Sequence, residues 1–288
     1  MKTSTTIPSS TDFDVSVIIP SYKPGAYFEE CLASVGDQSL DKEQFEIIIV
    51  LNGCGEPWLS ETKALIEKYL PRHNVKFIHI EQSGVSNARN MGIDVAGGQY
   101  ITFIDDDDYI SPMFLEIMLE TADPETVSVC DSHPFDDVTK EEVMPYRPHI
   151  AYQKLVGRSD ITILHARAIF NGPWMKLLNR SFIQGFRFDT TLAVGEDSLF
   201  MFAISKNINA VRLADRRALY HRRCRCGSAY SMHRAKSYWL KNCLRLISKY
   251  SIFYLSAPFS YNFKLYIRCI LGTLRGTWSQ LVRGYKLK

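Results

Sequence analysis

Four consecutive aspartates, Asp105–Asp108, directly follow a short apolar run in this sequence. Adjacent carboxylates repel one another, and a divalent cation would relieve that repulsion. Mg²⁺ and Mn²⁺ bind one or two protein carboxylates and complete their coordination shell with substrate phosphates. The cluster therefore predicts a Mn²⁺ or Mg²⁺ site for a phosphorylated substrate. The competing interpretation is a solvated loop whose aspartates cap a helix beginning near Ser111.

A second carboxylate pair, Glu196 and Asp197, follows Gly195 and precedes the apolar segment SLFMFAIS. A positioned carboxylate that accepts a substrate proton typically accelerates a reaction about 10²- to 10⁴-fold. Asp197 is therefore a candidate general base, supported by Glu196. The competing interpretation makes Asp197 the N-cap of a helix, and the two roles are compatible.

Cations that could meet the charge of a departing phosphate lie in the segment YHRRCRC. Arg223 is the expected phosphate contact, with His221 and Arg225 as alternatives. A zinc site made by His221, Cys224 and Cys226 is disfavoured, because no second ligand pair stands at the usual spacing.

The elements that must position these residues follow from apolar runs and helical spacing. The expected strands are 15–20, 46–51, 75–80 and 100–104, and the expected helices are 27–35, 60–70, 86–96 and one beginning at Ser111-Pro112. Gly97-Gly98 is expected to close a helix in the left-handed conformation. This alternation predicts a Rossmann-like α/β fold with a mostly parallel sheet, whose ligands bind at the carboxyl ends of the strands. The turns after Pro20, Leu51 and Ile104 share that edge.

The rest of the chain is organised around this sheet. Residues 1–12 are expected to form a disordered leader without the apolar core of a secretory signal, and no run approaches the roughly 20 apolar residues of a membrane span. The proline-containing stretch 131–160 predicts a long loop or insertion. A net charge of +3 favours no nucleic-acid partner. Seven scattered cysteines are expected to be small buried side chains in a reducing, cytoplasmic compartment.

Residues 232–288 combine eleven spaced aromatic side chains with many Lys and Arg and no Asp or Glu. Basic amphipathic helices with aromatic residues are typical of peripheral membrane contact, here at the cytoplasmic face of the inner membrane. An equally good interpretation is a helical appendage that packs on the catalytic domain or on a second subunit.

Five short motifs follow one another along the chain in the order of a known family. They are VSVIIPSYK, GVSNARNMGIDVAGGQYITFIDDDD, WMKLLNRSFI, GEDSLF and YHRRCRCGSAYS. With them the chain resembles family 2 of the inverting glycosyltransferases, which have the GT-A fold, over roughly residues 14–231. The resemblance implies a catalytic domain over 13–231, with a nucleotide-binding half over about 13–130 and an acceptor half over about 131–231.

The resemblance, together with the residue chemistry above, gives each candidate a role. The donor-binding candidates are Pro20, Ser21, Tyr22, Asn52, Arg89, Asp105, Asp106 and Arg223. Asp107, with Asp105, is expected to hold the metal, while Asp108 completes the D-x-D-D motif. Arg89 is expected to contact the nucleobase or a phosphate, or else to pair with a carboxylate of the aspartate cluster. Trp174 and Lys176 are expected on the acceptor side, with core packing an equally good interpretation of Trp174.

One motif departs from the family pattern. The chain has Leu51-Asn52-Gly53-Cys54 where the family usually has Asp-Asp-Gly-Ser. Asn52 offers an acceptor and a donor to a base edge, so nucleotide binding is still expected, although uridine specificity is less secure.

The sequence thus predicts inverting transfer of a hexose or N-acetylhexosamine from a nucleotide sugar, UDP-linked by preference, to a hydroxyl of a glycan or lipid-linked glycan. The resemblance suggests bacterial surface-polysaccharide synthesis. A nucleotidyltransferase is an alternative, but the Gly-rich phosphate loop usual near its first strand is missing. A non-catalytic nucleotide-sugar binder or assembly partner is another, and a catalytic base argues against it.

Overall fold

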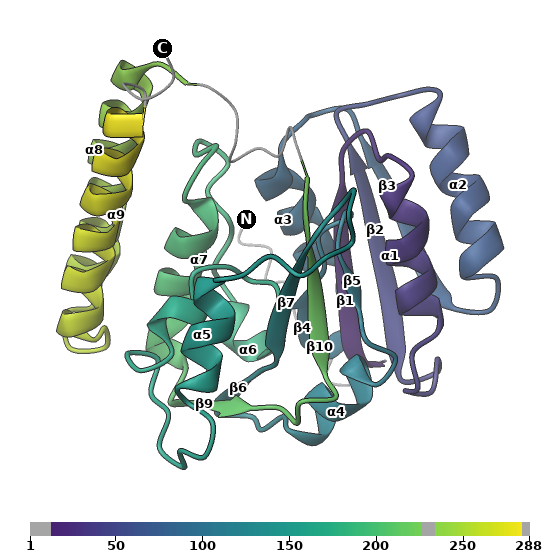
Figure 1. Cartoon of the computed structure of the whole chain (residues 1–288), viewed down its shortest axis with the longest axis horizontal. Helices are drawn as coiled ribbons and strands as arrows, with labels where there is room; N and C mark the ends of the chain where they lie inside the picture. Colours follow the sequence, from purple (N-terminus) through teal and green to yellow (C-terminus); the bar gives the residue numbers. More distant parts are fainter. Residues whose placement is uncertain (1–12, 226–233, 284–288) are drawn as a thin grey trace, which may run out of the picture.

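The chain forms an α/β fold around one large sheet (Figure 1). The computed structural model describes residues 13–225 and 234–283. The strand order is β3-β2-β1-β4-β8-β6-β9. The strands are β1 (Phe13–Ser21), β2 (Phe45–Asn52), β3 (Asn74–Ile80), β4 (Gly98–Phe103), β6 (Thr126–Val129), β8 (Lys176–Asn179) and β9 (Ala210–Leu213). Only β8 runs antiparallel to its neighbours in this sheet, so the predicted mostly parallel sheet is confirmed.

Helices cover the sheet and continue beyond it. They are α1 (Tyr27–Gly36), α2 (Trp58–Tyr69), α3 (Val85–Val95), α4 (Phe114–Glu120), α5 (Arg147–Gln153), α6 (Arg180–Ile183), α7 (Glu196–Ile204), α8 (Lys236–Ser256) and α9 (Phe263–Arg283), with short 3-10 turns at Arg167–Ile169 and Ser205–Asn207. Every residue of β2 is buried, as expected for a strand covered on both faces.

A second, smaller sheet stands at the carboxyl edge of the first. Its order is β5-β10-β7, formed by β5 (Tyr109–Ile110), β10 (Leu219–Cys224) and β7 (Asp131–Asp136). The strand β10 is antiparallel to β5 and parallel to β7. Because β5 follows the four aspartates, this sheet holds β10 against them.

The structure corrects three expectations. Residues 131–160 are not a plain loop, since they contain β7 and α5. Gly97-Gly98 is no left-handed helix cap: α3 ends at Val95 with extended backbone at Ala96, and Gly98 begins β4. The helix expected from Ser111-Pro112 begins later, at Phe114, because the Ser111 hydroxyl instead donates to the Arg217 carbonyl.

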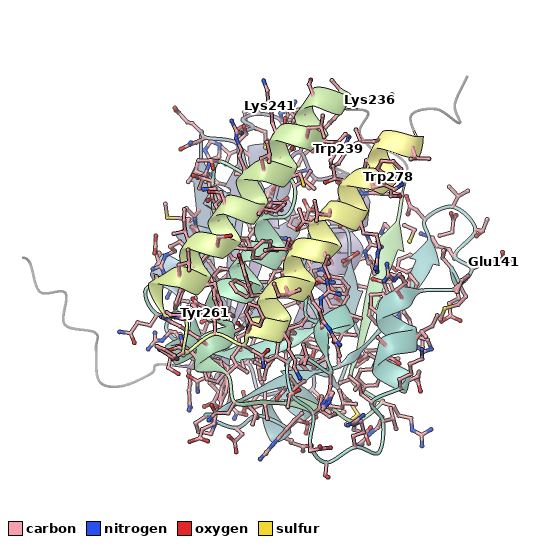
Figure 2. All side chains as sticks on the ribbon, turned by 90° about the vertical axis from the view of Figure 1, so that its left-hand side faces the viewer. Glu141, Lys236, Trp239, Lys241, Tyr261 and Trp278 are labelled. Carbon is pink, nitrogen blue, oxygen red and sulfur yellow. The ribbon has the colours of Figure 1, made fainter. Side chains whose placement is uncertain are left out.

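The last two described helices form a hairpin against the part of the chain that contains α7. Figure 2 faces this hairpin and shows α8 and α9 side by side. Its inner side packs on α7, where the Tyr250 hydroxyl donates to Ser198 and the Tyr261 hydroxyl donates to the Ala203 carbonyl. None of the helices within residues 13–225 and 234–283 combines the length and apolar content needed to cross a bilayer.

Candidate catalytic site

The carboxyl ends of β1, β2 and β4 are tied together by short hydrogen bonds. The Ser21 hydroxyl donates to Asp106 Oδ2 at 2.7 Å, and the Tyr22 backbone N–H reaches the same oxygen at 3.3 Å. Asn52 Nδ2 donates to the Ser21 carbonyl at 2.6 Å. Pro20 lies just before, within β1 and opposite Val50. Residues predicted from three separate turns therefore lie at one edge.

Asn52 has a supporting position in this edge. It is 2% exposed, and its Oδ1 accepts the Gly84 N–H at 2.8 Å while its Nδ2 is bound to Ser21. The amide thereby joins the end of β2 to the turns after β1 and before α3. The predicted base contact of Asn52 stays a prediction, and the structure gives its side chain partners within the protein.

The aspartate cluster is crowded as well as acidic. Burial raises the pKa of Asp106 to about 7, with the charge of Asp107 adding to the rise. Burial also raises the pKa of Asp107, helped by Asp105, and raises that of Asp108 well above its ordinary value. Burial and the mutual repulsion of the carboxylates therefore both disfavour the fully ionised cluster.

Arg89 connects this cluster to the second carboxylate pair. One terminal nitrogen lies 2.5 Å from Asp197 Oδ1, and the other lies 2.9 Å from Asp105 Oδ1. Its guanidinium is buried and stands over the Phe188 ring, with 5.3 Å between them. Burial opposes its charge, but Asp197, Asp105 and Glu196 raise the pKa of Arg89 above its ordinary value.

Glu196 and Asp197 occupy the first turn of α7. Gly195, with φ of 91°, is the N-cap, so Asp197 does not have the capping role that the sequence also allowed. A helix N-terminus stabilises carboxylates. Burial nevertheless raises the pKa of Glu196 to about 7 and raises that of Asp197, whose neighbour Arg89 opposes the rise. A raised pKa makes Asp197 a better proton acceptor than an ordinary carboxylate.

Asp108 and Arg223 join the aspartate cluster to β10. Asp108 accepts the Tyr220 hydroxyl and the Arg223 backbone N–H, both at 2.7 Å. The Arg223 guanidinium contacts Glu30 and Asp137 and donates to the Asp107 carbonyl. These partners occupy the side chain that was expected to bind phosphate, so that contact stays a prediction.

Two other arginines, Arg222 in β10 and Arg225 just after it, have fewer partners within the described residues than Arg223. Arg225 Nε lies 2.6 Å from Asp107 Oδ2. Arg222 shares a face of β10 with Tyr220, by strand alternation, and stands 5.8 Å from the Tyr146 ring. Within the described residues Arg222 has no ion-pair partner, although Asp108 and Asp105 help to raise its pKa against the effect of burial.

The donor set of the aspartate cluster fits a hard divalent cation. Asp105 Oδ1 faces Arg89 and Asp107 Oδ2 faces Arg225, so each carboxylate keeps a second oxygen. Two such oxygens are what Mg²⁺ or Mn²⁺ takes from a protein before phosphates complete its shell. A bound cation would lower the raised pKa values of Asp106 and Asp107, because it favours the ionised form of each carboxylate.

The acceptor-side candidates have unequal positions. Trp174 is half-buried, 5.4 Å from the Tyr220 ring, and its contact with a sugar stays a prediction. Lys176 is 1% exposed and donates to the Trp174 carbonyl, so it presents almost no surface to an acceptor. Burial lowers the pKa of Lys176 to about 7, against the opposing effects of Cys130 and Asp197.

The sequence did not single out Tyr220, Arg222 or Phe188. Tyr220 and Arg222 carried a usable signal, because alternate residues of a strand share a face and Tyr220 contacts Asp105 and Asp108. His221, an alternative phosphate contact, points to the other face and stacks on Tyr109. Cys226 lies outside the described residues; the other six cysteines are free, and four of them are buried as expected.

Sequence comparisons place these motifs in a known group. The model of the family described as "Glycosyl transferase family 2" matches residues 16–187 of this chain. EpsH of Bacillus subtilis (strain 168) is 31% identical over 232 residues, which are 77% of this chain and 64% of EpsH. The poly(ribitol-phosphate) beta-N-acetylglucosaminyltransferase TarS of Staphylococcus aureus is 26% identical over 72% of this chain and 35% of TarS. The chain thus spans less than two thirds of these relatives.

Solved structures agree on the fold. TarS residues 1–349, in complex with UDP-GlcNAc, give a TM-score of 0.68 at 22% identity, over 83% of this chain and 66% of that one. The mannosyltransferase PcManGT of Pyrobaculum calidifontis, in complex with GDP-Man and Mn²⁺, gives 0.57 at 15% identity, over 95% and 79%. With the ordered motifs and the matched residues, these findings show that the chain belongs to the family 2 glycosyltransferases and has the GT-A fold.

Proposed function

We propose that this enzyme transfers a sugar with inversion from a nucleotide sugar to a hydroxyl acceptor, with Asp197 as the general base. The observation that carries the proposal is the Arg89 bridge. One buried guanidinium joins Asp197 to Asp105, and so fixes the base relative to the carboxylates that would hold the donor's cation. Direct displacement needs this fixed relation, because misplacement by about 1 Å can cost 10²-fold in rate.

In the proposed step, Asp197 accepts the proton of the acceptor hydroxyl as its oxygen bonds to the anomeric carbon. The bond from that carbon to the diphosphate oxygen breaks, and the nucleoside diphosphate leaves with the electron pair. Arg222 and Arg225, which lie near Tyr146 and Asp107, would supply positive charge that stabilises this leaving group. Asp107 and Asp105 would hold a Mn²⁺ or Mg²⁺ ion, which when bound supplies further charge to the diphosphate.

A UDP-linked N-acetylhexosamine is the proposed donor. TarS, which resembles this chain in sequence and in fold, is named as an N-acetylglucosaminyltransferase and was solved with UDP-GlcNAc. The complex of PcManGT with GDP-Man and Mn²⁺ supports a nucleotide sugar and a divalent cation in general, and makes GDP-Man the second donor to test.

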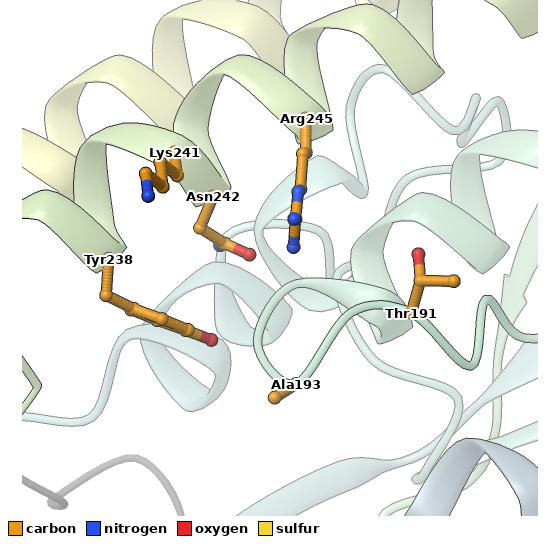
Figure 3. A pocket seen from close by; sticks show the side chains of 6 residues that line it. All are labelled: Thr191, Ala193, Tyr238, Lys241, Asn242 and Arg245. Carbon is orange, nitrogen blue, oxygen red and sulfur yellow. The ribbon is translucent and has the colours of Figure 1, made fainter.

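The acceptor is proposed to enter beside α7. A cavity of about 260 Å³ lies between the residues before Gly195 and the first turns of α8 (Figure 3). Its lining residues are Thr191, Ala193, Tyr238, Lys241, Asn242 and Arg245. The two cations on this wall, together with the lack of any acid after Asp215, favour an acceptor that carries phosphate or other negative charge.

The outer side of the α8–α9 hairpin is proposed to rest on an anionic membrane surface, at the cytoplasmic face, where a lipid-linked acceptor would be concentrated. Exposed apolar side chains on that side include Leu244, Leu255, Phe259 and Trp278. Basic residues interleave with them, which is the composition of interfacial helices.

A screen of nucleotide sugars tests the activity, with hydrolysis and transfer measured in the presence of Mn²⁺ or Mg²⁺. Chelation with EDTA, or Asp107→Ala, should remove most UDP-sugar binding in calorimetry. Asp197→Asn should leave donor binding nearly intact and reduce turnover at least about 100-fold. Asp94→Asn, an exposed aspartate of α3, is the matched control and should change neither quantity.

Turnover above about a tenth of the wild-type value in Asp197→Asn would show that another group is the base. Unchanged affinity after chelation and in Asp107→Ala would remove the cation from the proposal.

The acceptor cavity has its own test. Lys241→Gln and Arg245→Gln should raise the KM for an anionic acceptor and leave donor affinity unchanged, because both side chains line the cavity and not the aspartate cluster. Lys63→Gln, at an exposed position of α2, is the control. A KM for the acceptor that equals the wild-type value in all three variants would mean that the acceptor binds elsewhere.

A further inference from the structure

A second group of metal-binding side chains lies outside the aspartate cluster. Asp131 and His133 belong to β7, and His149 belongs to α5. One ligand-type atom from each of the three lies within 4.8 Å of the others. His149 Nδ1 is 3.0 Å from the Asp131 carboxylate, and His133 Nε2 is 3.6 Å from it. The Asp131 side chain is almost fully buried, while both histidine rings are partly exposed and so open to an entering ion.

Each of two prospective ligands has an outer partner that orients it. Glu142 Oε1 lies 3.3 Å from His133 Nδ1, so this nitrogen can carry the proton and leave Nε2 with its lone pair toward Asp131. Gln153 Nε2 and the Ser132 backbone N–H each donate to Asp131 at 2.8 Å. A carboxylate behind a ligating histidine is a regular feature of protein metal sites.

We propose that Asp131, His133 and His149 bind one Zn²⁺ ion, at a site separate from the hard-cation site of the aspartate cluster. Imidazole nitrogens suit zinc, whereas Mg²⁺ and Mn²⁺ prefer sites made of oxygen alone. Zinc bonds to nitrogen and oxygen of about 2.0–2.1 Å place tetrahedral ligands about 3.3 Å apart. The two measured separations, 3.0 and 3.6 Å, lie on either side of that value.

Such an ion would fasten α5 to β7. The segment between these two elements carries Tyr146, whose ring faces Arg222 at 5.8 Å. The register of β7 on β10 sets His133 opposite His221 and Pro134 opposite Arg222. Bound zinc would therefore position Tyr146 and, through it, Arg222; this consequence, unlike zinc binding itself, rests on the proposed function.

The alternative is a cluster held only by hydrogen bonds. Zinc titration of the full-length protein separates the two, after metal removal by a chelator, dialysis and alkylation of accessible thiols, and with no nucleotide present. We expect one Zn²⁺ per chain by calorimetry and a rise in Tm. Co²⁺, as a spectroscopic probe, should show the absorption of a tetrahedral site.

Variants locate the ion. His133→Ala and His149→Ala should each lose more than 100-fold in zinc affinity, and Glu142→Gln should lose about 10- to 100-fold as an outer partner. His165→Ala, an exposed histidine of another loop, should bind zinc as the wild type does. Circular dichroism checks that each variant folds; should His149→Ala unfold, the result for His133→Ala and Glu142→Gln decides.

Absence of zinc binding at micromolar concentrations, or wild-type affinity in His133→Ala, would overturn the proposal. Asp107→Ala should keep full zinc affinity while losing donor binding. The zinc site and the proposed transferase mechanism can therefore fail independently, because zinc affinity is measured without donor or acceptor.

Discussion

At the scale of single residues, the Arg89 guanidinium is the buried cation that joins the two carboxylate groups of the site. Its two terminal nitrogens serve Asp105 and Asp197, and its own side chain is 3% exposed. Removal of one partner from a buried ion pair strands the other charges in a medium that solvates them poorly, at a cost of about 3–5 kcal/mol. Arg89→Met should therefore lower the free energy of unfolding by about 3 kcal/mol and abolish transfer.

Urea unfolding followed by circular dichroism measures this loss. Arg187→Met is the matched control, because the pair of Arg187 with Asp94 is exposed and such pairs contribute about 0–1 kcal/mol. Equal stability losses in the two variants would mean that Arg89 has no special place in the network.

Lys176 presents the opposite case, a buried cation without a close carboxylate. Its pKa of about 7 lies below the ordinary 10.5, so the folded state disfavours its charge, with Cys130 and Asp197 the nearby groups that oppose this. Below pH 7 both states are protonated and the penalty is complete. Between pH 7 and 10.5 the unfolded state binds more protons, so wild-type stability should rise with pH.

Lys176→Met should consequently stabilise the protein, by an amount on the order of a few kcal/mol at pH 6 that shrinks as the pH approaches 10. Urea unfolding at several pH values measures both trends. A stability difference that does not vary with pH would show that the penalty at this position is not a charge penalty.

Much of the candidate site was predictable because it lies in local motifs. The aspartate cluster and the Glu196-Asp197 pair follow directly from short sequences at element boundaries. The contact of Arg89 with Asp105 was one of the two interpretations that the sequence allowed. Its contact with Asp197 was not predicted, since 108 residues separate the two and no motif joins them. Which arginine of β10 lies on the same strand face as Tyr220, the partner of Asp108, depends on the position of β10 in its sheet. This cannot be read from a single motif.

At the scale of elements, Gly98 is structurally important, as the sequence predicted, but for a different reason. Gly98 was expected to close a helix, but it begins β4, where its backbone N–H donates to the Ser16 hydroxyl of β1. A Cβ atom at Gly98 would lie 2.6 Å from the Ser16 backbone nitrogen and 2.7 Å from its hydroxyl. The strand pairing of β1 with β4, on which Asp105 depends for its position, therefore requires glycine here.

Gly98→Ala should lower the free energy of unfolding by about 1–3 kcal/mol, the usual cost of overpacking. Gly55→Ala is the control, because a Cβ atom there meets nothing within 4 Å. Thermal unfolding of both variants, read by circular dichroism, compares them. A Gly98→Ala protein as stable as Gly55→Ala would show that β1 and β4 can separate without cost.

The strands were more predictable than the helix ends. Continuous apolar runs mark β1, β2 and β4, since strands buried on both faces have no polar alternation. Helix α4 begins three residues after Ser111 because that serine serves the Arg217 carbonyl, a partner more than 100 residues away. Residues 131–160 gave no periodicity from which β7 or α5 could be recognised.

At the scale of the whole molecule, the α8–α9 hairpin has two different sides. The inner side belongs to the fold: a Cβ atom added to Gly195 would lie 2.7 Å from Leu246 Cδ1, and Tyr250 is 1% exposed. The packing interpretation is thus supported, and the N-cap of α7, which precedes Asp197, lies directly against α8. A chain ending at residue 231 should therefore lose its fold and precipitate.

The outer side is where membrane contact can be tested without disturbing the fold. Leu244 and Leu255 are 70% and 71% exposed, so Leu244→Gln and Leu255→Gln together should leave the thermal midpoint unchanged. The same pair should weaken binding to vesicles that contain anionic lipid, measured by co-sedimentation, because the apolar part of interfacial binding is lost. Val138→Gln, at a position 88% exposed and far from the hairpin in sequence, should bind as the wild type does. High salt should remove only the share that basic residues contribute, about 1 kcal/mol each. Wild-type protein that stays in the supernatant at low salt would contradict membrane contact, and would leave the outer side to a second subunit.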